Sequence, residues 1–275
     1  MVIDRSRRSC LLCGATFTGR TFLCRACADQ YRHQTVPLTV RKQFYEALDE
    51  AYPARSNTHG DWNVPVALLR ELERLPPDSR ILEIGAGGGF LAAALQERGF
   101  QRLVLTDLTA TSLAALRARV PAALFAAADA ARLPFRAGVF DAVISSDLIE
   151  HLPRPDVERH LHEVARVLAP GGSYFLKTPN RLVAEPFYRL RGLYDWHFWH
   201  PSMFSPGELR FALARHGLDM RLVAQPHLTG AQLAKLPGPR FLRTPAAHLP
   251  VGLLPAVARP HLEVVATRRT ARGLP

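Results

Sequence analysis

A glycine-rich segment that follows an apolar run constrains the fold of this chain more than any other feature. The sequence RILEIGAGGGF occupies residues 80–90, so an apolar strand that carries Glu83 leads into four glycines and then into a helix. Glycines let a backbone turn sharply and approach a ligand closely, although an ordinary strand-to-helix turn can also use them. A dinucleotide site needs a third glycine of the G-x-G-x-x-G pattern at position 90, and this chain has Phe90 there. The segment therefore predicts a nucleotide-sized ligand without a pyrophosphate, such as an adenosine that carries an amino-acid tail.

Apolar runs and amphipathic stretches alternate after the glycines. Two of the runs end in a carboxylate, at Asp107 and at Asp129. Asp107 lies about 20 residues beyond the glycines, where a carboxylate accepts both ribose hydroxyls. The spacing of apolar residues predicts a helix over residues 156–168. Strands are predicted at residues 102–107, 122–129, 140–146, 171–178 and 261–267. This alternation predicts a mostly parallel sheet with helices on both faces.

Several motifs stand in a fixed order along this part of the chain. They are E-x-G-x-G-x-G from Glu83, the strand-end Asp107, the pair Asp129-Ala130, FDAVISSDLIEHL from residue 140, and L-x-P-G-G from residue 168. The series resembles the class I S-adenosylmethionine-dependent methyltransferases of the type 11 group, which includes quinone-biosynthesis enzymes. The resemblance covers about residues 60–224 and the last strand. It implies an α/β fold with a doubly wound, mostly parallel, seven-stranded Rossmann-like methyltransferase sheet, and a ligand at the carboxyl ends of the first strands.

The resemblance also implies S-adenosylmethionine as the cofactor and a set of residues that bind it. The glycine loop would lie under the methionine moiety and the ribose, and Glu83 would fix the loop and the amino-acid end. Asp107 and Leu108 would hold the ribose and the adenine, while Asp129 and Ala130 would contact the adenine edge. The implied cofactor residues are Glu83, Gly85, Ala86, Gly87, Asp107, Leu108, Asp129, Ala130 and Ser146.

The acceptor side of such a site follows the fourth strand, where Asp147, Glu150 and His151 form a D-x-x-E-H pattern. If this segment is helical, the three side chains lie on one side of it. His151 is the candidate catalytic base, since an imidazole can take a proton near neutral pH from a hydroxyl or amine as the methyl group transfers. Alternatively, Glu150 and His151 only cap the next turn. In quinone-type enzymes a similar set can hold magnesium, but Asp147 replaces the usual glutamate.

All four cysteines lie near the amino terminus with the spacing C-x2-C-x10-C-x2-C. Two such knuckles supply the four thiolates of a tetrahedral zinc site, and a closed four-sulfur site is structural. Two disulfides are the alternative, which a reducing compartment disfavours. The sequence therefore predicts a small N-terminal zinc ribbon whose metal ligands are Cys10, Cys13, Cys24 and Cys27.

Breaks in composition divide the chain into parts. The predicted parts are a zinc ribbon at residues 1–34, a connector at residues 35–60 and a methyltransferase domain at residues 61–275 with an insertion at about residues 225–260. Of the formal net charge of +11, the first 60 residues carry +4 and the last 52 carry +6. These basic ends suit nucleic acid, an anionic membrane surface or a phosphorylated substrate, or they only keep the segments soluble.

Local signals predict three more helices. One spans residues 40–52 in the connector, and another spans residues 62–75. Ser205 to Glu208 form a capping box that begins a third helix, which ends at His216. The inward residues of the second helix are predicted to be Val66, Leu69 and Leu72.

The aromatic stretch YDWHFWHPSMF, residues 194–204, lies where this family places a substrate lid. Its histidine and proline breaks argue against a regular element. Its rings would either wall a flat or prenylated acceptor or pack onto the sheet edge as core. The rings concerned are Trp196, Phe198, Trp199 and Phe204.

The insertion before the last strand could extend the acceptor pocket, rest on a membrane surface, or pack against the sheet. Its apolar and flanking basic residues are Leu249, Val251, Leu253, Leu254, Arg243 and Arg259. The sequence contains no recognisable signal peptide and no stretch near 18 uninterrupted apolar residues, so we expect a cytoplasmic protein.

Together these features predict a methyltransferase that acts on a small-molecule or lipid-like acceptor by direct displacement at oxygen or nitrogen. A sulfonium methyl group is activated by its own charge, so the protein mainly aligns the reacting atoms and excludes water. Every cysteine lies in the predicted ribbon, which disfavours methylation through a thiolate adduct. RNA methylation is the alternative, because a zinc ribbon ahead of this fold resembles the ribosomal guanine methyltransferases. A non-catalytic, cofactor-gated interaction module is a further alternative.

Overall fold

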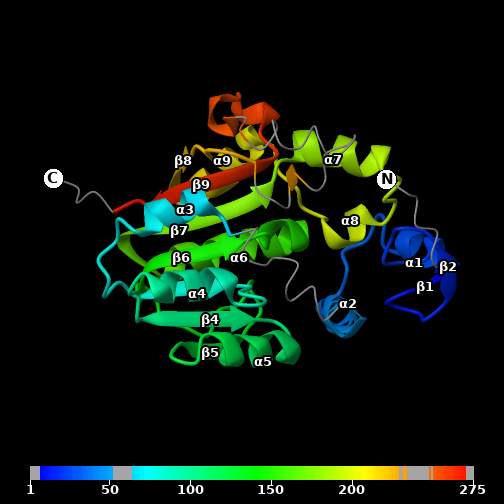
Figure 1. Ribbon diagram of the computed structural model, residues 1–275, viewed down its shortest axis with the longest axis horizontal. Coiled ribbons are helices and arrows are strands. Elements are labelled where there is room, and N and C mark those ends of the chain that lie inside the picture. Colours follow the sequence, from blue (N-terminus) through cyan, green and yellow to red (C-terminus); the bar gives the residue numbers. More distant parts are fainter. Residues whose placement is uncertain (1–6, 52–63, 229–231, 234–247, 249, 271–275) are drawn as a thin grey trace.

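A seven-stranded sheet forms the centre of the chain (Figure 1). The computed structural model describes residues 7–51, 64–228, 232–233, 248 and 250–270. The strand order is β5-β4-β3-β6-β7-β9-β8, in which β9 runs antiparallel to both neighbours and the other adjacent strands pair in parallel. The strands are β3 Ile81–Ile84, β4 Leu103–Asp107, β5 Leu124–Ala127, β6 Phe140–Ser146, β7 Leu168–Pro179, β8 Leu218–Leu222 and β9 His261–Arg268. The predicted mostly parallel, seven-stranded sheet is confirmed.

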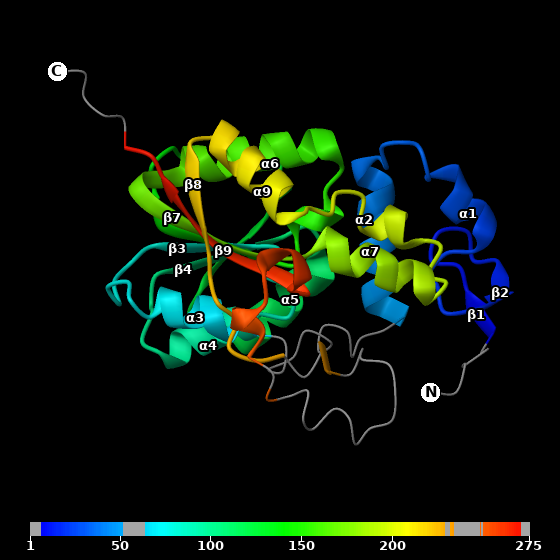
Figure 2. The ribbon, with the colours of Figure 1, turned by 90° about the horizontal axis from the view of Figure 1, so that it is seen from above.

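Helices cover both faces of this sheet, and each face has its own apolar core (Figure 2). Leu68, Leu95 and Leu116 are buried on one face, and Leu161 and Leu213 are buried on the other. Burial of each such leucine contributes about 1.5–3 kcal/mol, so both faces need a covering layer. One face carries α3 Val66–Leu72, α4 Phe90–Glu97 and α5 Ala110–Arg119, and the other carries α6 Arg154–Val167 and α9 Pro206–Arg215.

Two local predictions on these layers were wrong. In α3, Leu69 and Leu72 are buried as predicted, but Val66 is 48% exposed and Leu68 is buried instead. The buried face of α3 therefore includes Leu68, and it does not follow the spacing of three residues that was counted from Val66. Strand β7 begins at Leu168 and not at residue 171 as predicted, so the L-x-P-G-G motif lies inside the strand, at a register irregularity against β6.

Element ends show smaller differences. The strand predicted at residues 122–129 is the edge strand β5, which has only four residues. Helix α6 begins at Arg154, two residues earlier than predicted. The capping box that begins α9 is confirmed, since Ser205 and Glu208 each accept a hydrogen bond from the backbone amide of the other. The predicted helix start near Trp62 lies outside the described residues.

The amino-terminal residues lie beyond the carboxyl ends of the parallel strands (Figure 1). We call residues 7–30 the four-cysteine unit. It packs with α2 and α8 in an aromatic cluster, in which Phe44 lies 6.2 Å from Phe22 and 5.0 Å from Phe198 between ring centroids. The helices and strands at this end of the molecule are β1 Arg7–Ser9, β2 Thr16–Thr18, α1 Arg25–Gln30, α2 Leu38–Ala51, α7 Arg181–Leu190 and α8 Trp196–Trp199.

Helix α8 contradicts the expectation that residues 194–204 contain no regular element. It is a single turn, and the burial of Phe198 against the four-cysteine unit outweighs the local histidine and proline breaks. The helix predicted at residues 40–52 is present as α2.

The predicted insertion is described only in part, and Arg243 and Leu249 lie outside the described residues. Two short 3-10 turns are present, η5 Val251–Leu253 and η6 Ala256–Ala258. Val251 is buried there, whereas Leu253 is 83% exposed. Among the described residues, no helix has the length and apolar character needed to cross a membrane.

A chain of buried polar groups crosses the core between α6 and the sheet. His160 Nδ1 lies 3.0 Å from the carbonyl oxygen of Ala130, His160 Nε2 lies 3.0 Å from the Tyr174 hydroxyl, and that hydroxyl lies 2.6 Å from Ser145 Oγ. Because a carbonyl only accepts, His160 Nδ1 carries the proton, and Nε2 accepts from Tyr174. Burial lowers the pKa of His160 to about 4, so the imidazole stays neutral.

We expect His160 to make stability fall on mild acidification. The imidazole pKa is near 6.5 in the unfolded chain and about 4 in the folded chain, so its contribution is present above pH 6.5 and is lost as the pH falls towards 4. Between pH 7 and pH 5 this group alone should lower the free energy of unfolding by roughly 2 kcal/mol. Urea unfolding of the wild type and of His160→Gln at both pH values measures this difference. His162→Gln, at an exposed position on the same helix, is the control that should keep the wild-type slope; an unchanged slope in His160→Gln would contradict the assignment.

Candidate cofactor and acceptor site

The glycine loop joins β3 to α4 at the carboxyl end of a central strand. Gly87 has a φ of +51°, and no described atom lies within 4 Å of the place its Cβ would take. Gly89 has a φ of +75°, and a Cβ there would come within 2.9 Å of Leu116 in α5. Gly89 therefore lets α4 pack closely, while Phe90 begins the helix beneath the guanidinium of Arg119, 3.8 Å from its ring centroid. The open side at Gly87 is the side a ligand can approach.

Glu83 supplies a buried carboxyl group next to this loop. It is 4% exposed, and its Oε2 has no hydrogen-bond partner in the described part of the chain. Burial, with a smaller contribution from the charge of Asp107, raises the pKa of Glu83 to about 8. A cationic group placed beside Glu83 would favour the ionised form and pair with it. This buried oxygen therefore fits the ammonium group of an amino-acid tail.

Asp107 lies at the end of β4 and holds the loop. Its Oδ2 accepts a hydrogen bond from the Gly87 amide at 2.9 Å, and its Oδ1 accepts one from the Thr109 amide at 3.2 Å. Burial raises the pKa of Asp107, and these amides oppose that shift because they favour the ionised form. Each carboxylate oxygen has two lone pairs, so Asp107 keeps acceptor capacity for the hydroxyls of a ribose.

The other residues predicted to bind the cofactor lie at the same edge of the sheet, and we call this set of predicted residues the cofactor edge. Gly85 and Ala86 follow β3, and their amides donate to the Thr106 carbonyl at 2.8 and 3.0 Å. Asp129 follows β5, and its Oδ1 accepts from the Ala131 amide at 3.0 Å. The remaining residues of the set are half-buried or buried side chains at Leu108, Ala130 and Ser146.

Helix α2 covers this edge with a polar stripe that the sequence analysis missed. Arg41, Tyr45 and Asp49 stand four residues apart and therefore share a helix face. Arg41 forms a buried ion pair with Asp156 of α6, and the Tyr45 hydroxyl lies 2.8 Å from His151 Nδ1. Asp49 accepts hydrogen bonds from two hydroxyl groups at the start of α5, at 3.3 and 3.4 Å. The regular spacing of these residues is the signal that could have identified them.

His151 is the last residue of the 3-10 turn η3 Ile149–His151, which follows β6. Its Nδ1 lies 2.6 Å from the carbonyl oxygen of Trp199, which can only accept, so Nδ1 carries the proton. Nε2 is then the nitrogen that can accept a proton from an acceptor. Glu150, His151 and His200 each offer one potential metal-ligand atom, and these atoms lie within 4.8 Å of one another. His200 was missed in the sequence because only the fold brings α8 next to η3.

Glu150 and Asp147 have different partners, although both follow β6. Glu150 is fully buried, and its Oε2 accepts from the Thr178 hydroxyl at 2.9 Å. Its Oε1 has no hydrogen-bond partner among the residues described, but it lies 3.8 Å from His151 Nε2 and 4.0 Å from His200 Nε2. Burial and then the charge of Asp147 raise the pKa of Glu150 to about 8. Asp147, with a φ of +53°, pairs with Nζ of the buried Lys177 at 2.7 Å. In the structure, then, His200 and not Asp147 stands in the group with Glu150.

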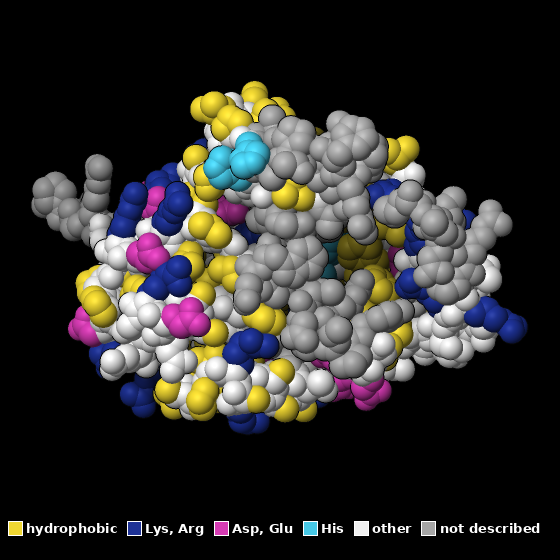
Figure 3. All heavy atoms as spheres, in the orientation of Figure 1, with side chains coloured by type: hydrophobic (Ala, Val, Ile, Leu, Met, Phe, Trp, Pro, Cys, Tyr) yellow, Lys and Arg dark blue, Asp and Glu magenta, His cyan; other side chains and the backbone are white. Residues whose placement is uncertain are grey.

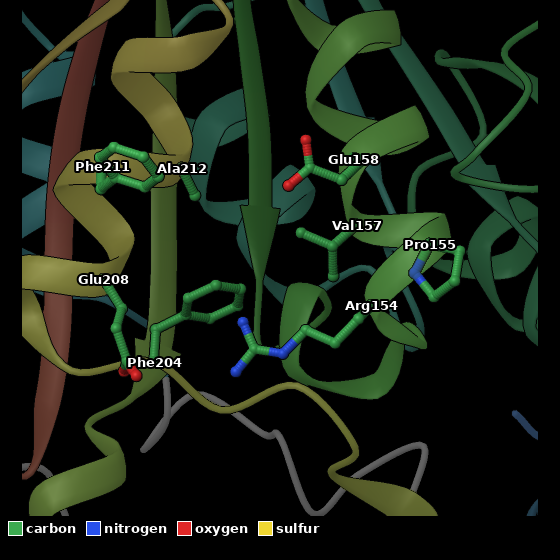
Figure 4. Close-up of a pocket in the computed structure, with 8 residues that line it drawn as sticks. All are labelled: Arg154, Pro155, Val157, Glu158, Phe204, Glu208, Phe211 and Ala212. Atoms are coloured by element: carbon green, nitrogen blue, oxygen red, sulfur yellow. The ribbon is translucent and has the colours of Figure 1, made fainter. Parts of the chain in front are cut away.

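The aromatic stretch divides between different surroundings. Phe198 and Trp199 pack with the four-cysteine unit and α2, and Trp196 packs with α7. Phe204 belongs to the sheet core and lines a cavity of about 400 Å³ between α6 and α9 (Figure 4). The guanidinium of Arg154 lies 4.5 Å from the Phe204 ring centroid in that cavity. None of the predicted cofactor residues lines it.

The four cysteines converge within the four-cysteine unit, and all four are free thiols. Their sulfur atoms lie within 4.8 Å of one another, and Cys13 Sγ lies 3.7 Å from Cys24 Sγ. A tetrahedron with zinc–sulfur bonds of about 2.3 Å has edges of about 3.8 Å. The spacing of this pair therefore matches a four-sulfur metal site.

Comparisons with known proteins agree with this fold. A family model described as "Methyltransferase domain" matches residues 82–176. The ubiquinone biosynthesis O-methyltransferase of Xanthomonas axonopodis pv. citri is 33% identical over 179 residues, which span 58% of this chain and 71% of that protein. EEF1A lysine methyltransferase 4 of Mus musculus is 29% identical over 201 residues, which span 65% of this chain and 76% of that protein. The chain belongs to the class I S-adenosylmethionine-dependent methyltransferase family.

A solved structure shows the same fold. It is a complex between the Trm112 methyltransferase activator of Haloferax volcanii and a methyltransferase described as putative, with a TM-score of 0.60 and 20% identity. The match covers 82% of this chain and 98% of the matched chain. The family and the fold together make this protein an S-adenosylmethionine-dependent methyltransferase, so the expectation of an enzyme is confirmed.

We expect Asp107→Ala to weaken the binding of S-adenosylmethionine by about tenfold to a hundredfold, because buried hydrogen bonds to a charged group are lost. Asp107→Asn, which keeps one acceptor oxygen, should lose less. Isothermal titration calorimetry measures both affinities. Asp141→Ala is the matched control, since Asp141 pairs with Arg80 at the opposite end of the sheet. Unchanged affinity in Asp107→Ala would remove this residue from the cofactor site.

Proposed function

We propose that this protein methylates a small-molecule or lipid-like acceptor at an oxygen or nitrogen atom by direct displacement. The observation that carries the proposal is the setting of His151. This potential base is held at Nδ1 by the Trp199 carbonyl and the Tyr45 hydroxyl, and its ring packs edge to face on the half-buried Tyr45 and the buried His200. An acceptor hydroxyl or amine on a flat or prenylated molecule fits such surroundings. A relative that acts in ubiquinone biosynthesis supports this choice of acceptor class.

The cofactor roles that we propose follow the positions described above. Glu83 pairs with the ammonium group, the open side of Gly87 receives the methionine moiety and ribose, and Asp107 accepts from the ribose hydroxyls. Leu108, Asp129, Ala130 and Ser146 complete the edge around the adenine and the methionine tail. The buried oxygen of Glu83 and the open space at Gly87 both fit S-adenosylmethionine.

Bound S-adenosylmethionine supplies a methyl group on a positively charged sulfur, which needs no nucleophilic side chain from the protein. The protein contributes alignment and the exclusion of water. Helix α2 covers the cofactor edge through Tyr45 and Asp49. His151 Nε2 accepts the proton that the acceptor atom loses, while Nδ1 stays hydrogen-bonded to the Trp199 carbonyl.

We also propose that Cys10, Cys13, Cys24 and Cys27 bind one structural zinc ion. The convergence of four free thiols and the 3.7 Å spacing of one pair support this proposal. All the proposed cofactor residues lie outside residues 10–27, so we assign the metal a structural role and no chemical step of methyl transfer.

RNA remains the second candidate acceptor, because arginines occur throughout the four-cysteine unit. On the face drawn in Figure 3, Lys and Arg side chains lie at both ends of the molecule, with acidic side chains among them at the left. Protein is a third candidate, because one relative is named as a lysine methyltransferase. Peripheral contact with a membrane would use the exposed Leu253 and its neighbours. The cytoplasmic location remains a proposal.

Labelled S-adenosylmethionine incubated with the protein and fractionated cell extract distinguishes these acceptors. We expect label in the small-molecule or lipid fraction, because the candidate base packs against the rings of Tyr45 and His200. Label that enters only RNA or only protein would contradict the proposed acceptor class.

We expect His151→Ala to lower the rate of that labelling by about a hundredfold or more, the usual contribution of a general base. The affinity for S-adenosylhomocysteine should stay unchanged, since no cofactor contact is removed. His162→Ala, at an exposed position, is the control. If His151→Ala keeps the wild-type rate at every pH, His151 is not the base.

Metal analysis of the reduced protein should find one zinc per chain. The variant Cys27→Ser should lose most of it, because a closed tetrahedral site needs four ligands. Reduced wild-type protein without zinc would contradict the metal proposal.

A further inference from the structure

Two residues that directly precede α8 form hydrogen bonds to the four-cysteine unit beside its second cysteine pair. Asp195 Oδ2 accepts hydrogen bonds from the amides of Phe22 at 2.7 Å and Leu23 at 3.1 Å. The Tyr194 hydroxyl donates to the Leu23 carbonyl at 2.9 Å. Phe22 and Leu23 directly precede Cys24. The backbone at the metal-ligand pattern is therefore held by side chains from about 170 positions later in the sequence.

The burial of Asp195 strengthens these hydrogen bonds to the four-cysteine unit. The residue is 1% exposed, and a buried carboxylate is costly unless it accepts hydrogen bonds. Bonds from amides to a charged oxygen are shorter and stronger than those between neutral groups. His197 adds a contact of 3.3 Å from Nε2 to the Ala28 carbonyl, and Arg25 stacks 4.3 Å above the Tyr194 ring. The start of α8 is thus fixed to the four-cysteine unit.

The other end of α8 holds the candidate base. Trp199 is the last residue of α8, and its carbonyl accepts from His151 Nδ1 at 2.6 Å. The Trp199 ring meets the Phe22 ring edge to face with centroids 6.2 Å apart. On the other side, the Tyr45 hydroxyl of α2 contacts the same nitrogen, and the preceding residue, Phe44, packs on Phe22. Both groups that hold His151 therefore rest on the four-cysteine unit.

We propose that Asp195 is a positioning residue through which the four-cysteine unit fixes the orientation and the proton position of His151. This inference rests on the proposed function, because it assigns a purpose to the orientation of that base. Asp195 touches neither the cofactor edge nor His151, and it acts through α8. The four-cysteine unit is then part of the acceptor site and not only a stable appendage.

The test measures the tautomer of His151 by NMR in protein labelled with ¹⁵N-histidine, at a pH where the imidazole is neutral. The His151 signal is identified by its loss in His151→Gln. Asp195→Ala removes the hydrogen bonds from the amides of Phe22 and Leu23, and Asp195→Asn keeps an oxygen that can accept from both amides. Asp29→Ala is the matched control, because Asp29 lies in the same unit and pairs only with its exposed neighbour Arg32 among the ion pairs described. Zinc content and S-adenosylhomocysteine affinity are measured for every variant.

We expect the Nδ1–H tautomer to dominate in the wild type and in Asp29→Ala. It should become the minor form in Asp195→Ala and be largely restored in Asp195→Asn. The affinity for S-adenosylhomocysteine should change by less than about twofold, since Asp195 makes no described hydrogen bond or ion pair with the cofactor residues. A loss of stability in Asp195→Ala without any change in the His151 signal would show that Asp195 is only structural and overturn the proposal.

If Asp195→Ala does not fold, Tyr194→Phe takes its place, because it removes one hydrogen bond and keeps the ring. A smaller shift in the same direction is then expected, and no shift would overturn the proposal. Failure of the proposed function is seen separately, as wild-type protein that does not bind S-adenosylhomocysteine.

Discussion

The burial of carboxyl groups at the carboxyl ends of the strands is the constraint on which the rest of the site depends. Glu83, Asp107 and Glu150 all lie there, and burial is the largest cause of the raised pKa of each. A protein keeps such groups only where donors or cations compensate for the lost water. For Asp107 the compensation comes from the amides of the glycine loop, which the same carboxylate holds in shape. For Glu83, whose Oε2 has no hydrogen-bond partner among the described residues, the proposed compensation is the ammonium group of the cofactor.

Helix α2 and the four-cysteine unit form one layer over this edge. The polar stripe of α2 contacts α5, α6 and η3, and its neighbouring apolar face packs in the aromatic cluster with the four-cysteine unit. A single helix therefore contacts the four-cysteine unit, the cofactor edge and the acceptor side of the site at once. Helix α8 makes a second connection of the same kind through Asp195 and Trp199. The boundary between the predicted ribbon and the predicted catalytic domain is thus crossed by specific hydrogen bonds.

The sequence predicted the parts of the structure that local pattern determines. Apolar runs gave the central strands, and the order of Glu83, the glycines and Asp107 predicted an edge that the structure brings together, because parallel strands end on one side. Residues whose neighbours come from distant segments were missed. His200 and Asp195 have no periodic signal, since they act through contacts with η3 and with residues 22–23. Helix α8 was missed because burial against another segment outweighed its local breaks. Val66 was misplaced because it is the first residue of a helix of only seven residues, in which apolar spacing alone does not define the buried face.

The concentration of all cysteines in one cluster has a practical consequence. If those sulfurs bind a metal ion as proposed, a single cysteine introduced elsewhere would be the sole free thiol of the molecule. Spectroscopic labels could then be attached one position at a time to α2 or to the exposed face of α9 without first removing native thiols. The movement of the covering layer during a catalytic cycle could be followed directly in the otherwise unaltered enzyme.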